Sequence, residues 1–163
     1  MKKVLVVMGS DSDLKVMEKC VDRLKSFDIP VEVRICSAHR TPAVAEQLAK
    51  NAAAEGFSVI IAAAGKAAHL GGVLAAYTTL PVIGVPMATS VMGGMDSLLS
   101  IVQMPKGIPV ATVAIDGADN AAILAAQMIA LSDEALAARL AAFKADMAAE
   151  VTAKDEKVRA QFA

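Results

Sequence analysis

The sequence predicts an α/β fold in which helices cover both faces of a parallel sheet. Strand patterns and helix patterns alternate along the chain from its first residues, which is typical of parallel sheets with right-handed crossovers. The first strand pattern, residues 4–8, is continuously apolar, and this indicates a strand that is buried on both faces. The chain has 163 residues, of which 56% are hydrophobic, so we expect a single domain over residues 1–163.

Five short segments of strand-forming residues predict the strands of this sheet. They are rich in Val and Ile, and Gly, Pro or polar turn residues bound each of them. The expected strands, in chain order, cover residues 4–8, 31–35, 57–64, 81–85 and 110–115.

Helix patterns fill the segments between the strands. The first helix has start signals at Ser10 and Asp11, and apolar residues recur at helical spacing from Leu14 onward. The second has Thr41 as its expected N-cap and Pro42 at its first helical position. The expected helices cover residues 14–24, 42–55, a short Ala-rich stretch after a loop at 65–72, residues 97–104, residues 120–131 and a long C-terminal helix from 134 towards 157.

Composition excludes several classes of function. The net charge of -1 provides no long-range field for nucleic acid or anionic lipid, so a bound phosphate has to be held by local groups. No apolar stretch approaches the thickness of a bilayer, and the run at 4–8 is too short for a signal-peptide core. Cys20 and Cys36 fit reduced core residues better than a catalytic thiol. We therefore expect a cytoplasmic protein with neither a nucleic-acid nor a membrane partner.

The apolar content also bears on assembly. Aromatic residues make up only 3% of the chain and Trp is absent, so the core has to be built from Val, Ile, Leu, Met and Ala. A small domain with a long final helix and an apolar excess favours an oligomer over a monomer.

Four polar or glycine-rich segments follow predicted strands. In a parallel α/β sheet, ligands bind outside the carboxyl ends of the strands. We therefore expect these segments to converge on one edge: residues 9–13, 37–40, 65–70 and 86–94.

The segment 9–13 joins the first strand to a helix. Gly9 permits close approach of a ligand, and the free N–H groups of a first helical turn favour phosphate. Neither the dinucleotide fingerprint nor the P-loop spacing is present, and an ordinary capped helix start is an equally good interpretation.

The chain has only two histidines, and both lie in these strand-end segments. His39 can give and take a proton near neutral pH, and Arg40 beside it offers a planar fork for phosphate or carboxylate. His69 lies among small residues. The alternatives are a surface His–Arg pair and a hydrogen-bonded loop histidine. Two histidines without nearby Cys or paired carboxylates make a metal site a weak hypothesis.

Five motifs in order and spacing resemble one family, the N5-carboxyaminoimidazole ribonucleotide mutases, the catalytic subunit of phosphoribosylaminoimidazole carboxylase. The resemblance covers nearly the whole chain from about Val4 to the final helix. The motifs are MGSDSD (8–13), SAHRTP (37–42), AAHL (67–70), LPVIGVP (80–86) and DSLLSIVQMP (96–105).

This resemblance implies a flavodoxin-like three-layer αβα sandwich, a homo-octamer and a ribonucleotide substrate. It implies conversion of N5-carboxyaminoimidazole ribonucleotide to its C4-carboxylated isomer in purine (IMP) biosynthesis, without a cofactor or metal. It implies His39 as general acid/base. The substrate-binding residues expected from the motifs and their flanks are Ser10, Asp13, Ser37, Ala38, Arg40, Gly65, Lys66, His69 and Leu70.

The sequence departs from the family pattern at two positions. Lys66 and Gly71 stand where the resemblance leads us to expect Gly and Pro. The related animal-type enzymes, which carboxylate aminoimidazole ribonucleotide directly with carbon dioxide, have a basic residue at the position of Lys66 and lack the histidine. We hypothesise that Lys66 lies near the carboxylate or carbon dioxide. Direct carboxylation, and a non-catalytic flavodoxin-like nucleotide-binding module, are the alternative functions.

Overall fold

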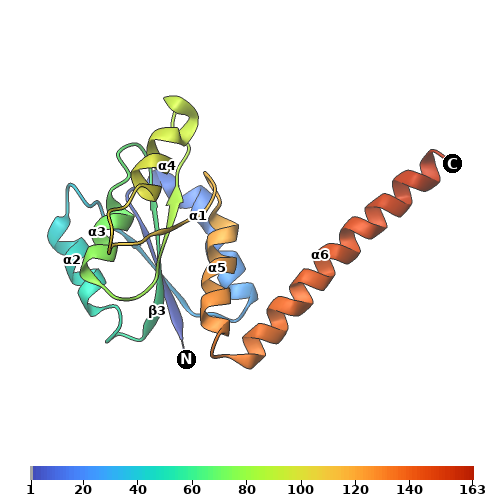
Figure 1. Ribbon diagram of the computed structural model, residues 1–163, viewed down its shortest axis with the longest axis horizontal. Coiled ribbons are helices and arrows are strands. Elements are labelled where there is room, and N and C mark those ends of the chain that lie inside the picture. Colours follow the sequence, from blue (N-terminus) through green and yellow to red (C-terminus); the bar gives the residue numbers. More distant parts are fainter. Residues whose placement is uncertain (1) are drawn as a thin grey trace.

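A computed structural model describes residues 2–163 and contains one five-stranded sheet (Figure 1). The strand order is β2-β1-β3-β4-β5 and every neighbouring pair is parallel. The strands are β1 (Lys3–Met8), β2 (Val31–Ile35), β3 (Phe57–Ala64), β4 (Val82–Pro86) and β5 (Ala111–Thr112). This order is that of a flavodoxin-like sheet, which confirms the predicted fold class.

Helices cover both faces of the sheet. One face packs against α1 (Leu14–Ser26), α5 (Ala118–Ala130) and the beginning of α6 (Glu134–Gln161). The other face packs against α2 (Pro42–Asn51), α3 (Leu70–Tyr77) and α4 (Met95–Val102). Two 3-10 turns, η1 (Asp11–Asp13) and η2 (Met92–Gly94), precede α1 and α4. The three layers are those expected from the alternation of strands and helices.

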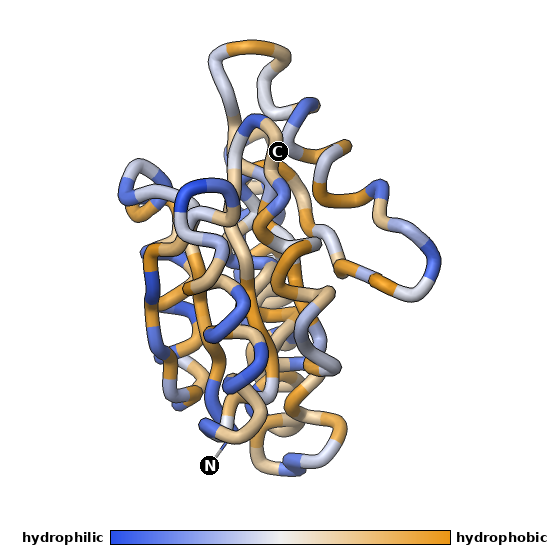
Figure 2. The backbone as a smooth tube through the Cα atoms, turned by 90° about the vertical axis from the view of Figure 1, so that its left-hand side faces the viewer, coloured by the Kyte–Doolittle hydropathy of each residue, from blue (hydrophilic) through white to orange (hydrophobic). Residues whose placement is uncertain are grey.

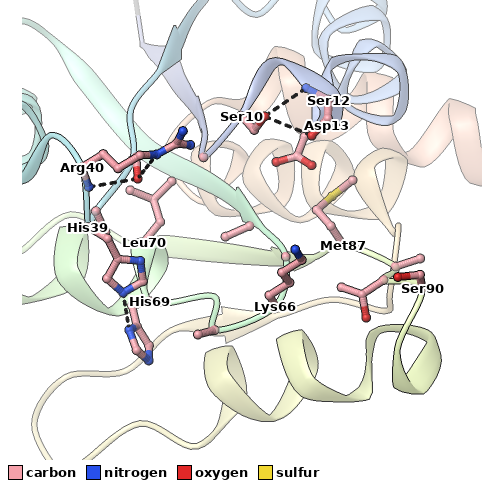
Figure 3. Close-up of a pocket in the computed structure, with 18 residues that line it drawn as sticks. Ser10, Ser12, Asp13, His39, Arg40, Lys66, His69, Leu70, Met87 and Ser90 are labelled. Carbon is pink, nitrogen blue, oxygen red and sulfur yellow. Dashed lines mark hydrogen bonds between the residues drawn. The ribbon is translucent and has the colours of Figure 1, made fainter.

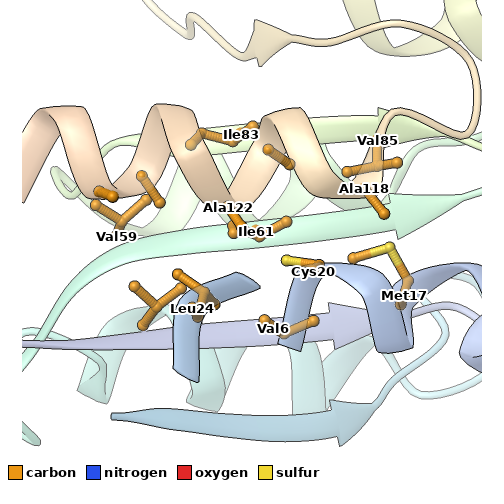
Figure 4. Packing of buried hydrophobic residues seen from close by; sticks show 14 of the residues in the cluster. Val6, Met17, Cys20, Leu24, Val59, Ile61, Ile83, Val85, Ala118 and Ala122 are labelled. Carbon is orange, nitrogen blue, oxygen red and sulfur yellow. The ribbon is translucent and has the colours of Figure 1, made fainter. Parts of the chain in front are cut away.

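Alternate residues of the central strands point into the two hydrophobic cores on opposite faces of the sheet. On β3, Ile61 faces α1 and α5, whereas Ile60 belongs to the opposite core (Figure 4). Cys20 of α1 is fully buried in the first core, and burial raises the pKa of its thiol to about 12. Both cysteines are free and buried, as predicted. Such a thiol stays protonated and packs as a small apolar side chain.

Glycine allows one helix to approach the sheet closely. A Cβ on Gly84 of β4 would lie 2.3 Å from the Cγ2 atom of Ile101 in α4. Any larger residue at this position would push α4 away from the sheet. Because α4 follows the strand-end segment at residues 87–94, this contact also positions one side of the ligand edge.

Several boundaries differ from the prediction. The third helix starts at Leu70, inside the expected loop 65–72, and includes the buried Gly71, where an added Cβ would already touch the Val110 and Ala62 side chains. Helix α4 starts at Met95, two residues before the predicted 97, because left-handed Gly94 forms its N-cap. The fifth strand is only Ala111–Thr112, since it pairs with β4 at just those two residues.

Helix α6 leaves the body of the protein as a long arm (Figure 1). It ends at Gln161 and is therefore slightly longer than predicted. Its first turns pack on the core through Leu136, Leu140 and Phe143, but Val151 is 65% exposed. Figure 2 shows a hydrophobic stretch at the tip of the segment that leads into α4, at the top of both views, and Val91 and Met92 in this segment are exposed. Within residues 2–163, no helix combines the length and apolar character needed to cross a membrane.

Candidate active site

The four strand-end segments line one pocket of about 720 Å³ (Figure 3). They come from the ends of β1, β2, β3 and β4, which confirms that these segments converge on one edge of the sheet. The pocket is lined by Gly9, Ser10, Ser12, Asp13, Ser37, Ala38, His39, Arg40, Ala64, Gly65, Lys66, Ala67, His69, Leu70, Met87, Ala88, Thr89 and Ser90.

The pocket contains all ten of the predicted site residues, although their roles remain predictions. It also contains side chains that the motifs did not single out, chiefly those of the wall at Met87, Ala88, Thr89 and Ser90. The sequence signal for this wall was its position directly after β4. The sequence predicts that residues 86–94 lie at the ligand edge, but nothing in their composition distinguishes the four that line the pocket.

The two histidines form a hydrogen-bonded pair at this pocket. The Nε2 atom of His39 lies 2.7 Å from the Nδ1 atom of His69. The ring centroids are 4.8 Å apart and the ring planes meet at 70°. His39 stands on the turn after β2, whereas His69 is the N-cap residue of α3. One ring must donate and the other accept, so the two facing nitrogens share a single proton.

A compact turn holds His39 and Arg40. The Ser37 hydroxyl accepts hydrogen bonds from the Arg40 backbone N–H (3.2 Å) and from its Nε–H (3.4 Å). The Thr41 hydroxyl accepts from the Ser37 N–H (3.0 Å) and donates to the Ser37 carbonyl (2.9 Å). Thr41 is the N-cap residue with Pro42 after it, as predicted, but its hydroxyl makes no cap bond to α2 because it closes this turn instead.

The segment after β1 is folded around Ser10. The Ser10 hydroxyl accepts from the Ser12 N–H (3.3 Å) and caps η1. Asp13 is 9% exposed, and burial raises the pKa of its carboxyl, with the charges of Asp116 and Asp11 adding to the effect and a Ser10 backbone hydrogen bond opposing it. Burial acts in this direction because it penalises the charged form of a carboxyl group more than the neutral form.

Lys66 has an unusual backbone. Its φ is +56°, in the left-handed region that favours glycine. For a residue with a Cβ this conformation costs about 1 kcal/mol. The strain explains why glycine suits this position. Because Lys66 also lines the pocket, the fold bears that cost at a place where an amine can meet a ligand.

The wall after β4 is fixed by several hydrogen bonds. The Met87 N–H donates to the Ala64 carbonyl (3.0 Å), and the buried Ser97 hydroxyl donates to the Met87 carbonyl (2.7 Å). The Thr89 hydroxyl donates to Asp96 (2.9 Å). These bonds join the wall to β3 and to α4.

The residues present offer no evident metal centre. Across residues 2–163, no group of three or more His, Cys, Asp or Glu side chains lies in an arrangement that could hold a metal ion. What the pocket offers is a proton-sharing imidazole pair, a guanidinium, an amine and several hydroxyl groups. This inventory suits proton transfer on an anionic substrate.

Comparisons with known proteins point to one family. Residues 3–150 match the family model of AIR carboxylase. The chain is 52% identical over 159 residues to the N5-carboxyaminoimidazole ribonucleotide mutase of Methanocaldococcus jannaschii, which covers 98% of this chain and 99% of that protein. It is 55% identical over 153 residues to the mutase of Mycobacterium leprae, covering 94% and 90%. The crystal structure of Treponema denticola PurE superposes with a TM-score of 0.88 at 30% identity, covering 96% of this chain and 98% of that one.

Proposed function

The chain belongs to the AIR carboxylase family, and we propose that it isomerises N5-carboxyaminoimidazole ribonucleotide to 4-carboxy-5-aminoimidazole ribonucleotide in purine biosynthesis, with His39 as general acid/base. Relatives at 52–55% identity that carry the mutase name support this activity. The observation that supports the role of His39 is its pairing with His69 at the edge of the ligand pocket. Direct carboxylation and a non-catalytic module are disfavoured by the same relatives.

The chemistry begins at the carbamate nitrogen. An imidazolium donates its proton to this nitrogen, the N–C bond breaks, its electron pair returns to nitrogen, and carbon dioxide is released. The freed aminoimidazole is an enamine-like nucleophile, whose C4 atom attacks the carbon dioxide and forms the new C–C bond. The imidazole then removes the C4 proton, which restores the aromatic ring and the imidazolium. No proton is gained or lost overall, and a pocket that retains carbon dioxide favours its recapture.

The histidine pair suits a proton that is given at one position and taken at another. His39 holds the mobile proton, and the hydrogen bond to His69 offers a second nitrogen that can accept or return it. In this scheme, Ser10 and Arg40 bind the ribonucleotide phosphate. Asp13, which lines the same pocket, binds a hydroxyl group of the ribose.

The remaining expected residues complete the binding surface. Ser37 holds Arg40 through two hydrogen bonds, and Ala38 contributes a small side chain to the pocket lining. Gly65 and Leu70 lie at opposite ends of the loop that carries His69. Lys66, from the same loop, would pair with the carboxylate as it leaves the nitrogen and re-forms on carbon.

We also propose a homo-octamer in the cytoplasm, as the family resemblance implies. Two exposed apolar regions are suited to subunit contacts. One is the far half of α6 and its C-cap residue, with Val151, Val158 and Phe162, and the other is the segment before α4, with Val91 and Met92. Large apolar side chains in such positions are typical of surfaces that another chain covers.

The test separates the carboxyl sources. The enzyme is supplied with labelled bicarbonate and unlabelled N-carboxylated substrate, and label in the product is measured. A closed mutase incorporates little label, because the carbon dioxide that it releases is the carbon dioxide that it uses. Label incorporated to the level of the bicarbonate pool would contradict the mutase and support direct carboxylation. A mixture with no product at all would contradict both.

A further inference from the structure

Asp116 stands outside the motifs and beside the pocket, in the turn between β5 and α5. Its φ is +56°, a left-handed conformation that Asp tolerates better than most residues. Its backbone N–H donates to the Pro86 carbonyl (2.8 Å), and this bond extends the β4–β5 pairing past the end of the short fifth strand. The residue therefore sits at the base of the wall formed by residues 87–90.

The carboxylate of Asp116 contacts the wall directly. Its Oδ1 atom accepts a hydrogen bond from the Ala88 backbone N–H at 2.9 Å. Ala88 lines the pocket, and its neighbour Met87 is held on the other side by Ser97. A bond to an ionised acceptor is among the stronger kinds of hydrogen bond. Residues 87–88 are thus tied to α4 by one bond and to the β5–α5 turn by another.

Packing confirms that this part of the wall has little freedom. A Cβ on Gly94 would lie 3.1 Å from the Ala88 Cα atom and 2.9 Å from the Ile115 Cγ2 atom. Residue 88, the start of α4 and the residue before Asp116 therefore meet with no spare space. Asp116 also lies close enough to Asp13, which lines the pocket, for its charge to contribute to the raised pKa of that carboxyl.

From these contacts we propose that Asp116 is a positioning residue for the substrate pocket. Its carboxylate accepts a hydrogen bond from the Ala88 N–H and thereby holds the 87–90 wall in its ligand-binding position. This inference rests on the proposed function for its substrate. It adds a residue from the turn after the fifth strand to a pocket whose lining comes from the segments after the first four. The effect is on binding, since the proton-carrying pair lies on the loops after β2 and β3.

Two substitutions separate the effect of the Asp116 carboxylate from the effect of its left-handed backbone. Asp116→Gly keeps the left-handed turn without strain but removes the acceptor, whereas Asp116→Asn keeps an acceptor oxygen and a residue that tolerates positive φ. Asp28→Gly is the matched control. Asp28 has a φ of +58° and lies in the turn after α1, outside the pocket lining.

The experiment measures kcat and KM for the N-carboxylated ribonucleotide together with amide hydrogen exchange at residues 88–90. We expect Asp116→Gly to raise KM about tenfold with kcat within about threefold, and to speed exchange at 88–90 about tenfold. Asp116→Asn is expected to recover most of the KM, and Asp28→Gly to change neither quantity. Exchange at 88–90 that is unchanged in Asp116→Gly would overturn the proposal. So would a wild-type KM in that variant, or a KM in Asp116→Asn as high as that of the glycine variant. Because exchange needs no substrate, failure of the wild-type enzyme to turn over would contradict the proposed function without affecting the test of the wall.

Discussion

The Nε2 atom of His39 and the Nδ1 atom of His69 lie 2.7 Å apart, although the residues are 30 positions apart in sequence and follow different strands. Because β2 and β3 both run parallel to β1, their carboxyl ends emerge at the same edge of the sheet, with one strand between them. Strand order and strand direction thus bring the two histidine-bearing loops together. The hydrogen bond turns two isolated imidazoles into one unit with a shared proton.

If the histidines act as one unit, their substitutions should not add. His69→Asn should lower kcat about tenfold or more, because His39 loses the partner that accepts or returns its proton. The double variant His39→Asn with His69→Asn should then be no slower than His39→Asn alone, to within about threefold. Single-turnover rates for the three variants measure this coupling. Losses that multiply in the double variant would indicate two independent roles.

Substitutions of Lys66 can separate the effect of its backbone strain on stability from the effect of its charged amine on binding. Lys66→Ala and Lys66→Gly both remove the amine, but only glycine relieves the left-handed backbone at φ +56°. We expect the glycine variant to unfold with a free energy about 1 kcal/mol higher than the alanine variant. If the amine binds the carboxylate, both variants should raise KM about tenfold. Turnover and affinity unchanged in Lys66→Gly would eliminate that role.

Burial of Asp13 predicts a pH-dependent cost to stability. Because the pKa of its carboxyl is raised in the folded state, the unfolded chain ionises first as the pH rises. Stability is therefore lost from the ordinary aspartate value of 3.8 up to the higher folded pKa. Asp13→Asn should be more stable than the wild type at pH 7, and the difference should shrink as the pH falls towards 3.8. Denaturant unfolding across this range measures it, and a difference independent of pH would refute the assignment.

Gly93 and Gly94 form a matched pair at the start of α4. Both have positive φ, +62° and +99°, but within residues 2–163 a Cβ on Gly93 would meet no heavy atom within 4 Å. Gly93→Ala should cost about 1 kcal/mol of stability from backbone strain alone. Gly94→Ala should cost about 1–3 kcal/mol more, because its Cβ meets the Ala88 backbone and the Ile115 side chain. It should also raise KM, which Gly93→Ala should leave unchanged.

Much of this fold could be predicted because its strands are simple. Residues 57–64 form a strand with the expected bounds, since their apolar run lies between turn residues. Residues 31–35 do so because Val31, Val33 and Ile35 alternate with polar residues. The boundary errors arise where tertiary contacts override local signals. Glycine at position 71 favours a loop over a helix, yet Gly71 lies inside α3, where it is buried close to β3 and to the segment before β5.

The candidate site likewise combines residues that the sequence predicts with contacts that depend on the tertiary structure. Motifs and the strand-end rule selected residues that the fold brings into one pocket, including His39 and Arg40. The bond between His39 and His69 could not be predicted, because it depends on strand order and on the exact start of α3. Asp116 carried no sequence signal, because its role depends on a backbone N–H group in another loop.

The central claim is that His39 carries the proton, and the most direct measurement is single-turnover kinetics of His39→Asn together with its affinity for the ribonucleotide. The amide can fill the space of the imidazole but cannot donate and accept a proton in turn. We expect turnover to fall by about 10³-fold or more, while affinity stays within about tenfold of the wild type, or 1.4 kcal/mol. Turnover at the wild-type rate in His39→Asn would contradict the account.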